Sequence, residues 1–253
     1  MGGLEAALLA QRTDALSNGD AHALNCVNMP IARQRVPKAW FMHWCKTFSD
    51  QSLRMKTVHR EAIARLVPTL LCGEQSAVSV FHVEAERLSR KARNASLSIF
   101  RAIEADECLH EAGLQMLCAK LPVAPDLHAI KRRSQRFFLK LGQAKSVAQH
   151  FSQVAQLDSA VCMLMWHIEN SAVGRNPMIG SLVGQIKNDE ARHVSISRRH
   201  ALVLGVSRNE YQALGEQVFC GLTKSLTPVA DSFEAIGVDS DRLFKRIQHR
   251  CLQ

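Results

Sequence analysis

The sequence predicts an all-α protein. Apolar residues recur at helical spacing in long segments, glycine and proline fall mostly between these segments, and runs that alternate apolar and polar residues are scarce. The motif Glu-x-x-His occurs twice, at Glu107–His110 and Glu190–His193. Residues three apart share a face of a helix, so each motif presents a carboxylate and an imidazole together. Two such motifs on facing helices are typical of a four-helix bundle that holds two metal ions.

The composition is that of a globular chain without membrane-spanning segments. Hydrophobic residues make up 47% of the 253 residues, and no apolar run reaches the roughly 18 residues that a membrane span needs. The N-terminus lacks the basic stretch of a secretory signal, and the 8 cysteines form no Cys-x-x-Cys pair. We therefore expect a reduced, cytoplasmic setting and no membrane partner.

The formal net charge of +9 favours acidic partners such as nucleic acid, an acidic carrier protein or an anionic substrate. Lysine and arginine are nevertheless spread along the chain without interleaved aromatic residues, as on an ordinary solvated basic surface. Charge alone therefore leaves both interpretations open.

The chain is expected to begin irregularly and then to become helical. Residues 1–35 carry few periodic apolar positions and predict an irregular leader. Residues 36–253 predict a single helical domain whose core bundle spans about 68–205. Within 38–66 we expect two short helices with a break near Asp50, which is a suitable N-cap for the second.

The first two bundle helices are expected to form an antiparallel pair. The first is expected from Pro68, a residue that suits the first turn of a helix, to about Arg90. The second is expected from about Ala95 to Ala119, where a segment with two prolines ends it.

The third bundle helix is expected over about Lys145–Val173, after a basic and partly helical crossover at 127–150. The fourth begins after Asn176, a favourable N-cap that is followed by proline, and ends at Gly205. Two further helices are expected to flank the bundle, over 208–225 and 240–250.

The positions of two further carboxylates follow from the predicted turns. In an antiparallel helix pair, residues equally far from the connecting turn lie level with each other. With the first turn near 90–91, Glu107 lies level with Glu74, and with the second turn near 174, Glu190 lies level with Asp158. Glu169 is the alternative on the third helix, on nearly the same face as Asp158 but roughly 16 Å further along the axis.

The predicted metal ligands are therefore Glu74, Glu107, His110, Asp158, Glu190 and His193. Four carboxylates and two imidazoles suit two iron ions, with manganese as the alternative, and leave positions open for O₂. Asp106 and Asp189 directly precede the two motif glutamates. They are expected either to hydrogen-bond the histidines of other helices or to lie in solvent.

Other residues bear on the chemistry less directly. His82 and His167 flank the predicted bundle and are either additional ligands or ordinary core and rim residues. Tyr211 is the only tyrosine and lies outside the predicted bundle, which argues against a tyrosyl radical beside the metals. The substrate pocket is expected in apolar surroundings near Val78, Phe81, Ile103 and Cys162.

Three segments resemble a known group of proteins. Cys72–Gln75, Ala102–His110 and Pro177–His193 are similar to the ferritin-like di-iron oxygenases, and most similar to the para-aminobenzoate N-oxygenase family, over about residues 65–205. The resemblance implies a ferritin-like four-helix bundle with extra flanking helices, and a homodimer.

The chain departs from that family at two ligand positions. The family has a glutamate where this chain has Asp158, and an additional histidine ligand where this chain has Ile186. The second difference changes the coordination of one iron. N-oxygenation, C-oxygenation and desaturation therefore stay open as alternatives.

The resemblance implies an enzyme that activates O₂ at a di-iron centre, with electrons from an external donor. Its substrate is then a small organic metabolite, either free or attached to an acidic carrier protein. Two alternatives use the same bundle: a hydroxylase of tRNA or another macromolecule, and an iron- or manganese-binding protein without catalysis.

Overall fold

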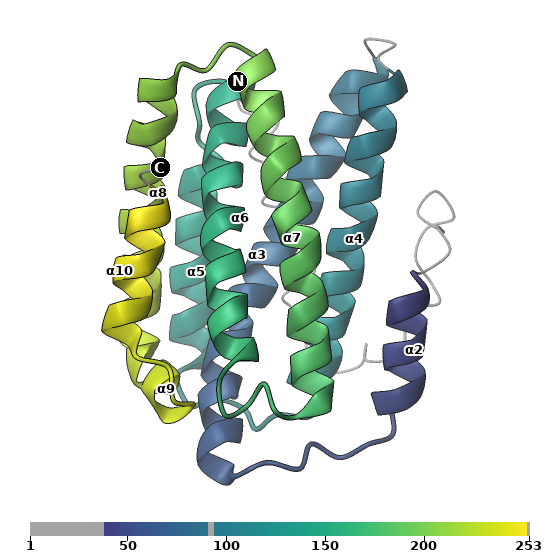
Figure 1. Cartoon of the computed structure of the whole chain (residues 1–253), viewed down its shortest axis with the longest axis vertical. Coiled ribbons are helices and arrows are strands. Elements are labelled where there is room, and N and C mark those ends of the chain that lie inside the picture. Colours follow the sequence, from purple (N-terminus) through teal and green to yellow (C-terminus); the bar gives the residue numbers. More distant parts are fainter. Residues whose placement is uncertain (1–37, 91–93, 252–253) are drawn as a thin grey trace.

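The computed structural model describes residues 38–90 and 94–251, and all regular secondary structure within them is helical (Figure 1). The predicted all-α class is thereby confirmed. The predicted irregular leader at 1–35 lies outside the described residues. Within 38–90 and 94–251, no helix combines the length and apolar composition that a membrane span requires.

Four long helices lie side by side and form the body of the molecule (Figure 1). Helix α3 packs along α4, helix α6 packs along α7, and α4 contacts α7. The four helices are α3 (Thr57–Ser89), α4 (Asn94–Cys118), α6 (Val147–Glu169) and α7 (Pro177–Val203).

Shorter helices cover the outside of these four. Helix α2 packs on α7, α5 and α9 pack on α3, and α8 and α10 pack on α6 (Figure 1). Their bounds are α2 (Ala39–Phe48), α5 (Leu127–Leu141), α8 (Arg208–Leu226), α9 (Ala230–Ala235) and α10 (Ser240–Cys251). A short 3₁₀ helix at Thr227–Val229 joins α8 to α9. The helices expected at 208–225 and 240–250 are confirmed, whereas α9 was not expected.

The apolar core is divided into two main clusters along the four long helices. The larger cluster contains residues from the end of α4 and the beginning of α7, among them Leu114 and Leu182. The smaller contains residues from the other end of the same helices, among them Phe100 and Ala201. On both α4 and α7 the Glu-x-x-His motif falls between the two clusters, so apolar layers enclose it from above and below.

The expected start of the first bundle helix is wrong. Helix α3 begins at Thr57 and continues through Pro68. A proline inside a helix costs roughly 3 kcal/mol because it removes a hydrogen bond and crowds the preceding turn. The turns before it bury Ile63 and Leu66, which are 1% and 2% exposed, and each such burial contributes about 1.5–3 kcal/mol. Tertiary packing therefore outweighs the local signal.

The predicted capping role of Asp50 is also wrong. Asp50 lies in the turn after α2, and Lys56 precedes α3 without a side-chain cap. The third bundle helix ends earlier than expected. Helix α6 ends at Glu169, a few residues before the predicted end at Val173. The chain then turns back so tightly at Gly174 that only glycine fits there. A Cβ atom on Gly174 would lie 1.9 Å from the carbonyl oxygen of Glu169.

The predicted start and end of α7 are confirmed. The Asn176 side chain accepts hydrogen bonds from the backbone N–H groups of Met178 and Ile179 at 3.1 and 3.4 Å. After α7, Gly205 adopts φ +98°, a left-handed conformation that glycine favours and that ends a helix.

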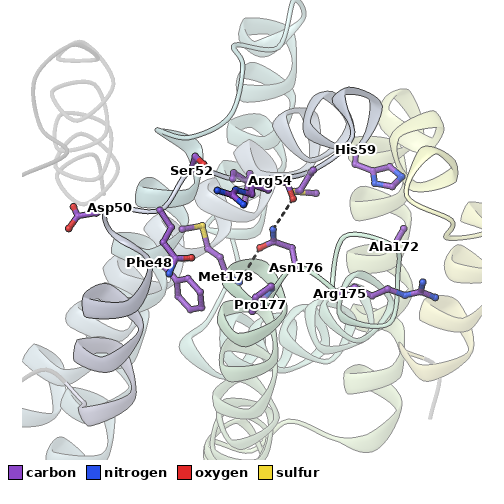
Figure 2. Close-up of a pocket in the computed structure, with 13 residues that line it drawn as sticks. Phe48, Asp50, Ser52, Arg54, His59, Ala172, Arg175, Asn176, Pro177 and Met178 are labelled. Atoms are coloured by element: carbon purple, nitrogen blue, oxygen red, sulfur yellow. Dashed lines mark hydrogen bonds between the residues drawn. The ribbon is translucent and has the colours of Figure 1, made fainter.

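A pocket of about 670 Å³ lies beside the N-terminus of α7, between residues 48–59 and 172–178 (Figure 2). The Nδ2 group of Asn176 donates a hydrogen bond to the carbonyl oxygen of Arg54 at 3.4 Å across it. None of the six predicted metal ligands lines this pocket.

Candidate metal centre

All six predicted ligands are buried on the four long helices. Helix α3 carries Glu74, α4 carries the first Glu-x-x-His motif, α6 carries Asp158 and α7 carries the second motif. The exposed fractions are 3% for Glu74, 1% for Glu107, 0% for His110, 7% for Asp158, 3% for Glu190 and 0% for His193. Buried charged residues are costly unless they are paired or bind a metal ion, so this cluster requires a specific explanation.

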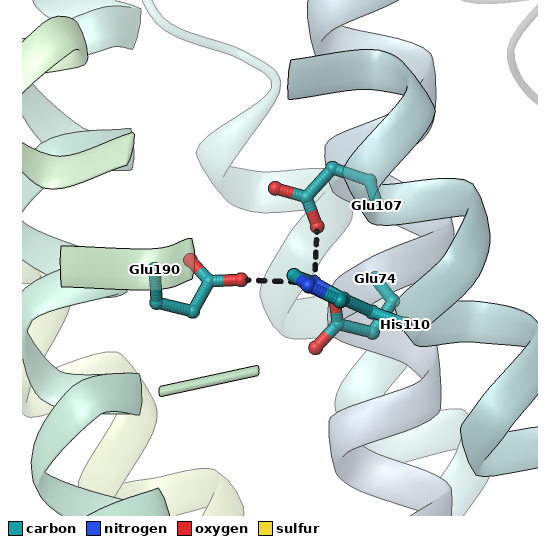
Figure 3. Close-up of side chains that lie close together, drawn as sticks. All are labelled: Glu74, Glu107, His110 and Glu190. Carbon is teal, nitrogen blue, oxygen red and sulfur yellow. Dashed lines mark hydrogen bonds and ion pairs between the residues drawn. The ribbon is translucent and has the colours of Figure 1, made fainter. Parts of the chain in front are cut away.

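His110 lies at the centre of one half of the cluster (Figure 3). Its Nδ1 atom is 3.2 Å from Oε2 of Glu74, 3.5 Å from Oε1 of Glu190 and 3.6 Å from Oε2 of Glu107. One ligand atom from each of these four residues lies within 4.8 Å of the others. Three carboxylates and one ring nitrogen thus face a common point.

His193 faces the same two motif glutamates from the other half of the cluster. Its Nδ1 atom is 2.9 Å from Oε1 of Glu107 and 3.6 Å from Oε2 of Glu190. Each motif glutamate therefore directs one oxygen toward each histidine. Although Nδ1 of His193 lies close to Glu107, it makes no hydrogen bond and is buried.

Asp158, rather than Glu169, is the carboxylate that α6 contributes to this cluster. Asp158 lines the same cavity as Glu74, Glu107 and Glu190, and its Oδ2 atom is buried without a hydrogen-bond partner. The carboxylate of Glu169 instead lies 2.5 Å from Nζ of Lys187, and its side chain is 31% exposed.

The protonation of the cluster reflects its crowded negative charge. Burial, together with the neighbouring carboxylates, raises the pKa of Glu74 and of Asp158 well above the usual range. Burial opposes protonation of the two histidines, but the carboxylates around them raise the pKa of His110 and of His193 well above normal. Without a cation, protons must therefore compensate part of the negative charge.

The two aspartates that precede the motif glutamates hydrogen-bond the histidines crosswise. Nε2 of His110 on α4 lies 3.3 Å from Oδ2 of Asp189 on α7, and Nε2 of His193 on α7 lies 3.5 Å from Oδ2 of Asp106 on α4. The predicted hydrogen bonds to histidines of other helices are confirmed. An Nε2–H group that donates outward leaves the Nδ1 lone pair directed into the cluster.

Two cations hold both aspartates in place. Nζ of Lys38 lies 2.8 Å from Oδ1 of Asp106 and 3.0 Å from Oδ1 of Asp189, and Arg192 also pairs with both carboxylates. Although burial opposes it, these cations and the histidines lower the pKa of Asp106 and of Asp189. Both aspartates are therefore ionised.

Sequence reasoning missed Lys38 and Arg192. Arg192 lies inside the second motif, at a position that the motif does not specify. Lys38 is separated from its partners by more than 65 residues. No local signal in the sequence could have indicated its contact with them.

A cavity of about 820 Å³ opens between α3, α6 and the connection from α5 to α6, and four carboxylates of the cluster line it. The expected substrate pocket is misplaced. Val78, Phe81 and Ile103 are buried in the core, and Sγ of Cys162 lies 3.7 Å from the carbonyl oxygen of Lys187. None of these four residues lines the cavity. The cavity instead lies between α3 and α6, and the link after α5 (residues 142–146) forms part of its wall.

The other candidate ligands lie outside the cluster. Nδ1 of His82 pairs with Oε1 of Glu104 at 2.8 Å, and His167 packs edge-on against Trp166. Ile186 stands where the resembled family has a further histidine ligand, and it is fully buried in the larger apolar cluster. The described residues therefore bring together the six predicted ligands and place none of these three with them.

Comparisons with protein-family models, with curated proteins and with solved structures find no match to this chain. A functional interpretation must therefore be based on the geometry and chemistry of the site itself.

Proposed function

We propose that this chain is a non-haem di-iron oxidoreductase that uses O₂ to oxidise a small organic metabolite, on a ferritin-like four-helix bundle. The main support is the symmetric placement of two buried histidines around two shared glutamates, with Nδ1 of each ring facing both carboxylates. Two glutamates that face both histidines in this way would suit a pair of metal ions.

The residues present fit two divalent cations. The four buried carboxylates among the six candidate ligands carry four negative charges when ionised, which two divalent ions balance. Buried atoms without hydrogen-bond partners include Oε2 of Glu107, Oδ2 of Asp158 and Nδ1 of His193, all of which are metal-ligating atom types. Mixed carboxylate and imidazole ligands suit both iron and manganese. We favour iron because the three similar segments resemble di-iron oxygenases, and manganese is the alternative.

The contacts suggest which residues would hold each ion. Glu74 lies 3.2 Å from Nδ1 of His110 and would hold one ion with it, and Asp158 and His193 would hold the other. The two motif glutamates would be shared between the ions. Asp106 and Asp189 would keep each imidazole in the tautomer that binds metal through Nδ1.

When bound, a pair of ferrous ions supplies the two-electron reduction of O₂ that a side chain cannot perform. In a monooxygenation, one oxygen atom enters the substrate and the other leaves as water, with two electrons from an external donor and two protons. The protein would hold the substrate in the cavity beside the carboxylates and exclude bulk water with the apolar layers on both sides of the site.

Metal content and reaction with O₂ test this proposal. The purified chain is expected to bind about two irons, and the reduced protein is expected to give a transient visible absorption band after mixing with O₂. Glu107→Ala and Glu190→Ala should each remove both ions, because each removes a shared ligand. Glu169→Ala is the matched control on α6, since Glu169 pairs with Lys187 outside the cluster.

Asp158→Ala discriminates the two carboxylates of α6 and should reduce the iron content where Glu169→Ala does not. Full iron occupancy in both Glu107→Ala and Glu190→Ala would overturn the proposal. Iron binding without any reaction with O₂ would support a non-catalytic metal-binding protein.

A second candidate function is hydroxylation of tRNA or another macromolecule, which the net charge of +9 favours. The cavity favours a small molecule, because it is of the size and apolar character typical of small-ligand pockets. RNA binding that weakens steeply with added salt would support the macromolecular alternative.

A further inference from the structure

The cavity beside the carboxylates is elongated along two helices. Its lining extends from Gly73 to Arg87 on α3 and from Val147 to Asp158 on α6. At 1.5 Å per residue, these stretches span roughly 21 and 16 Å. The buried carboxylates lie at one end of this length, and the link between α5 and α6 lies over the other.

The walls between the two ends are mostly apolar. At the end away from the carboxylates, the apolar side chains of Val83 and Val147 are each 38% exposed, so this end is the mouth of the cavity. Exposed aliphatic side chains on facing helices favour an occupant with an apolar body. The apolar lining between the two ends includes Ala77, Val80, Phe151, Val154 and Leu157.

The charges of the cavity differ between its two ends. The closed end holds the carboxylates of the candidate metal centre. The open end holds Lys145, for which no ion pair is found in the described part of the chain. Arg87 and Glu84 also line the cavity, but they pair with each other, and Glu84 also pairs with His200.

We propose that this cavity binds an elongated amphipathic carboxylate, with its aliphatic chain between α3 and α6 and its carboxylate at the mouth beside Lys145. A carboxylate at the closed end would be buried beside four protein carboxylates, whose charge two divalent ions would neutralise but not exceed, whereas an alkyl chain there gains free energy by leaving water. The end of the chain remote from the carboxylate therefore lies next to Glu74 and Asp158. This inference names the class of substrate for the proposed function. It rests on that function for the claim that the bound carboxylate is oxidised.

Calorimetric titration of the full chain tests the inference without any turnover. The ligands are octanoate, decanoate, dodecanoate and 1-decanol, below their aggregation concentrations, added to metal-free and to zinc-loaded protein. Affinity should rise about fourfold with each added methylene until the cavity is full. Decanoate should bind about two- to fivefold more tightly than decanol, the contribution of one exposed ion pair.

Substitutions locate the ligand. Val154→Trp and Ala77→Phe fill the cavity and should weaken decanoate binding by about tenfold or more. Lys145→Gln should remove the preference for decanoate over decanol and leave decanol binding unchanged. Val203→Trp is the control, because Val203 is 71% exposed on α7 and does not line the cavity. If the filling variants do not fold, Val83→Trp at the exposed mouth makes the same test.

Equal binding of decanol and decanoate would overturn the inference, as would decanoate binding that none of the filling variants weakens. The two proposals fail separately. A chain that binds decanoate as expected but no iron contradicts only the proposed function, and a chain with two irons that binds no carboxylate contradicts only this inference.

Discussion

Replacing Asp189 with asparagine probes the crossed pairing between aspartates and histidines. Asp189 faces Nε2 of His110 at 3.3 Å, Nζ of Lys38 at 3.0 Å and the guanidinium of Arg192 at 3.3 Å. Asparagine keeps the shape of the side chain and one acceptor oxygen. It removes the negative charge that polarises the imidazole and that pairs with both cations.

The expected effect is a loss of metal affinity at one half of the cluster. A carboxylate that orients a metal-bound histidine typically contributes ten- to hundredfold in metal affinity, or about 1.4–2.7 kcal/mol. The side chain of Asp189 is 9% exposed, so solvent screens its charge only weakly. We therefore expect Asp189→Asn to weaken binding of the ion beside Glu74 and His110 by this amount.

Competition with a chelator for cobalt(II), followed by its visible absorption, measures the affinity. Asp106→Asn is the matched variant and should weaken the ion beside Asp158 and His193 instead. Asp126→Asn is the control, because Asp126 pairs with Arg65 at 3.0 Å and is not near any of the six candidate metal ligands. If Asp189→Asn bound both ions within about twofold of the unchanged chain, the aspartates would not support the histidines as argued.

Three further predictions concern stability and reactivity. Removing metal from the purified protein should lower the unfolding temperature by about 5–10 °C for each site that was saturated at a hundred times its Kd; an unchanged melting curve after chelation and dialysis would count against the centre. Burial raises the pKa of the Cys118 thiol to about 11, so iodoacetamide at pH 8.5 should label it far more slowly than the exposed Cys220; equal rates by mass spectrometry would contradict this. Burial alone would raise the pKa of Glu84, but its ion pairs with an arginine and a histidine lower this pKa overall. The stability that these ion pairs give the folded protein should therefore be complete above the ordinary carboxyl pKa and should be lost as pH falls through the lowered pKa. The difference in urea stability between the unchanged chain and Glu84→Gln should therefore shrink on acidification, and a constant difference would be inconsistent with this pairing.

Much of the site could be predicted because its signals are local. The Glu-x-x-His spacing places a carboxylate and an imidazole on one helix face, and the cap at Asn176 sets where α7 begins. Since both connecting turns were located closely, counting residues from them identified Glu74 and Asp158 as level with the two motif glutamates. The structure brings these residues together in one buried cluster.

The parts that sequence reasoning missed depend on contacts between distant segments. Helix α3 continues through Pro68 because the turns before it are buried against other helices, which a rule about proline does not include. The cavity lies between α3 and α6 and is walled in part by the link after α5, and no periodic pattern indicates where a loop passes.

The sequence by itself determined the helical class, the boundaries of α4 and α7, and five of the six residues that meet between four helices. These follow from helical periodicity, capping and level positions, which are properties of single helices and of adjacent pairs. Only the tertiary structure decided that Glu169 pairs with Lys187 while Asp158 joins the cluster. It alone also brought Lys38 to both aspartates, because partners so far apart in the chain meet only when the whole domain packs.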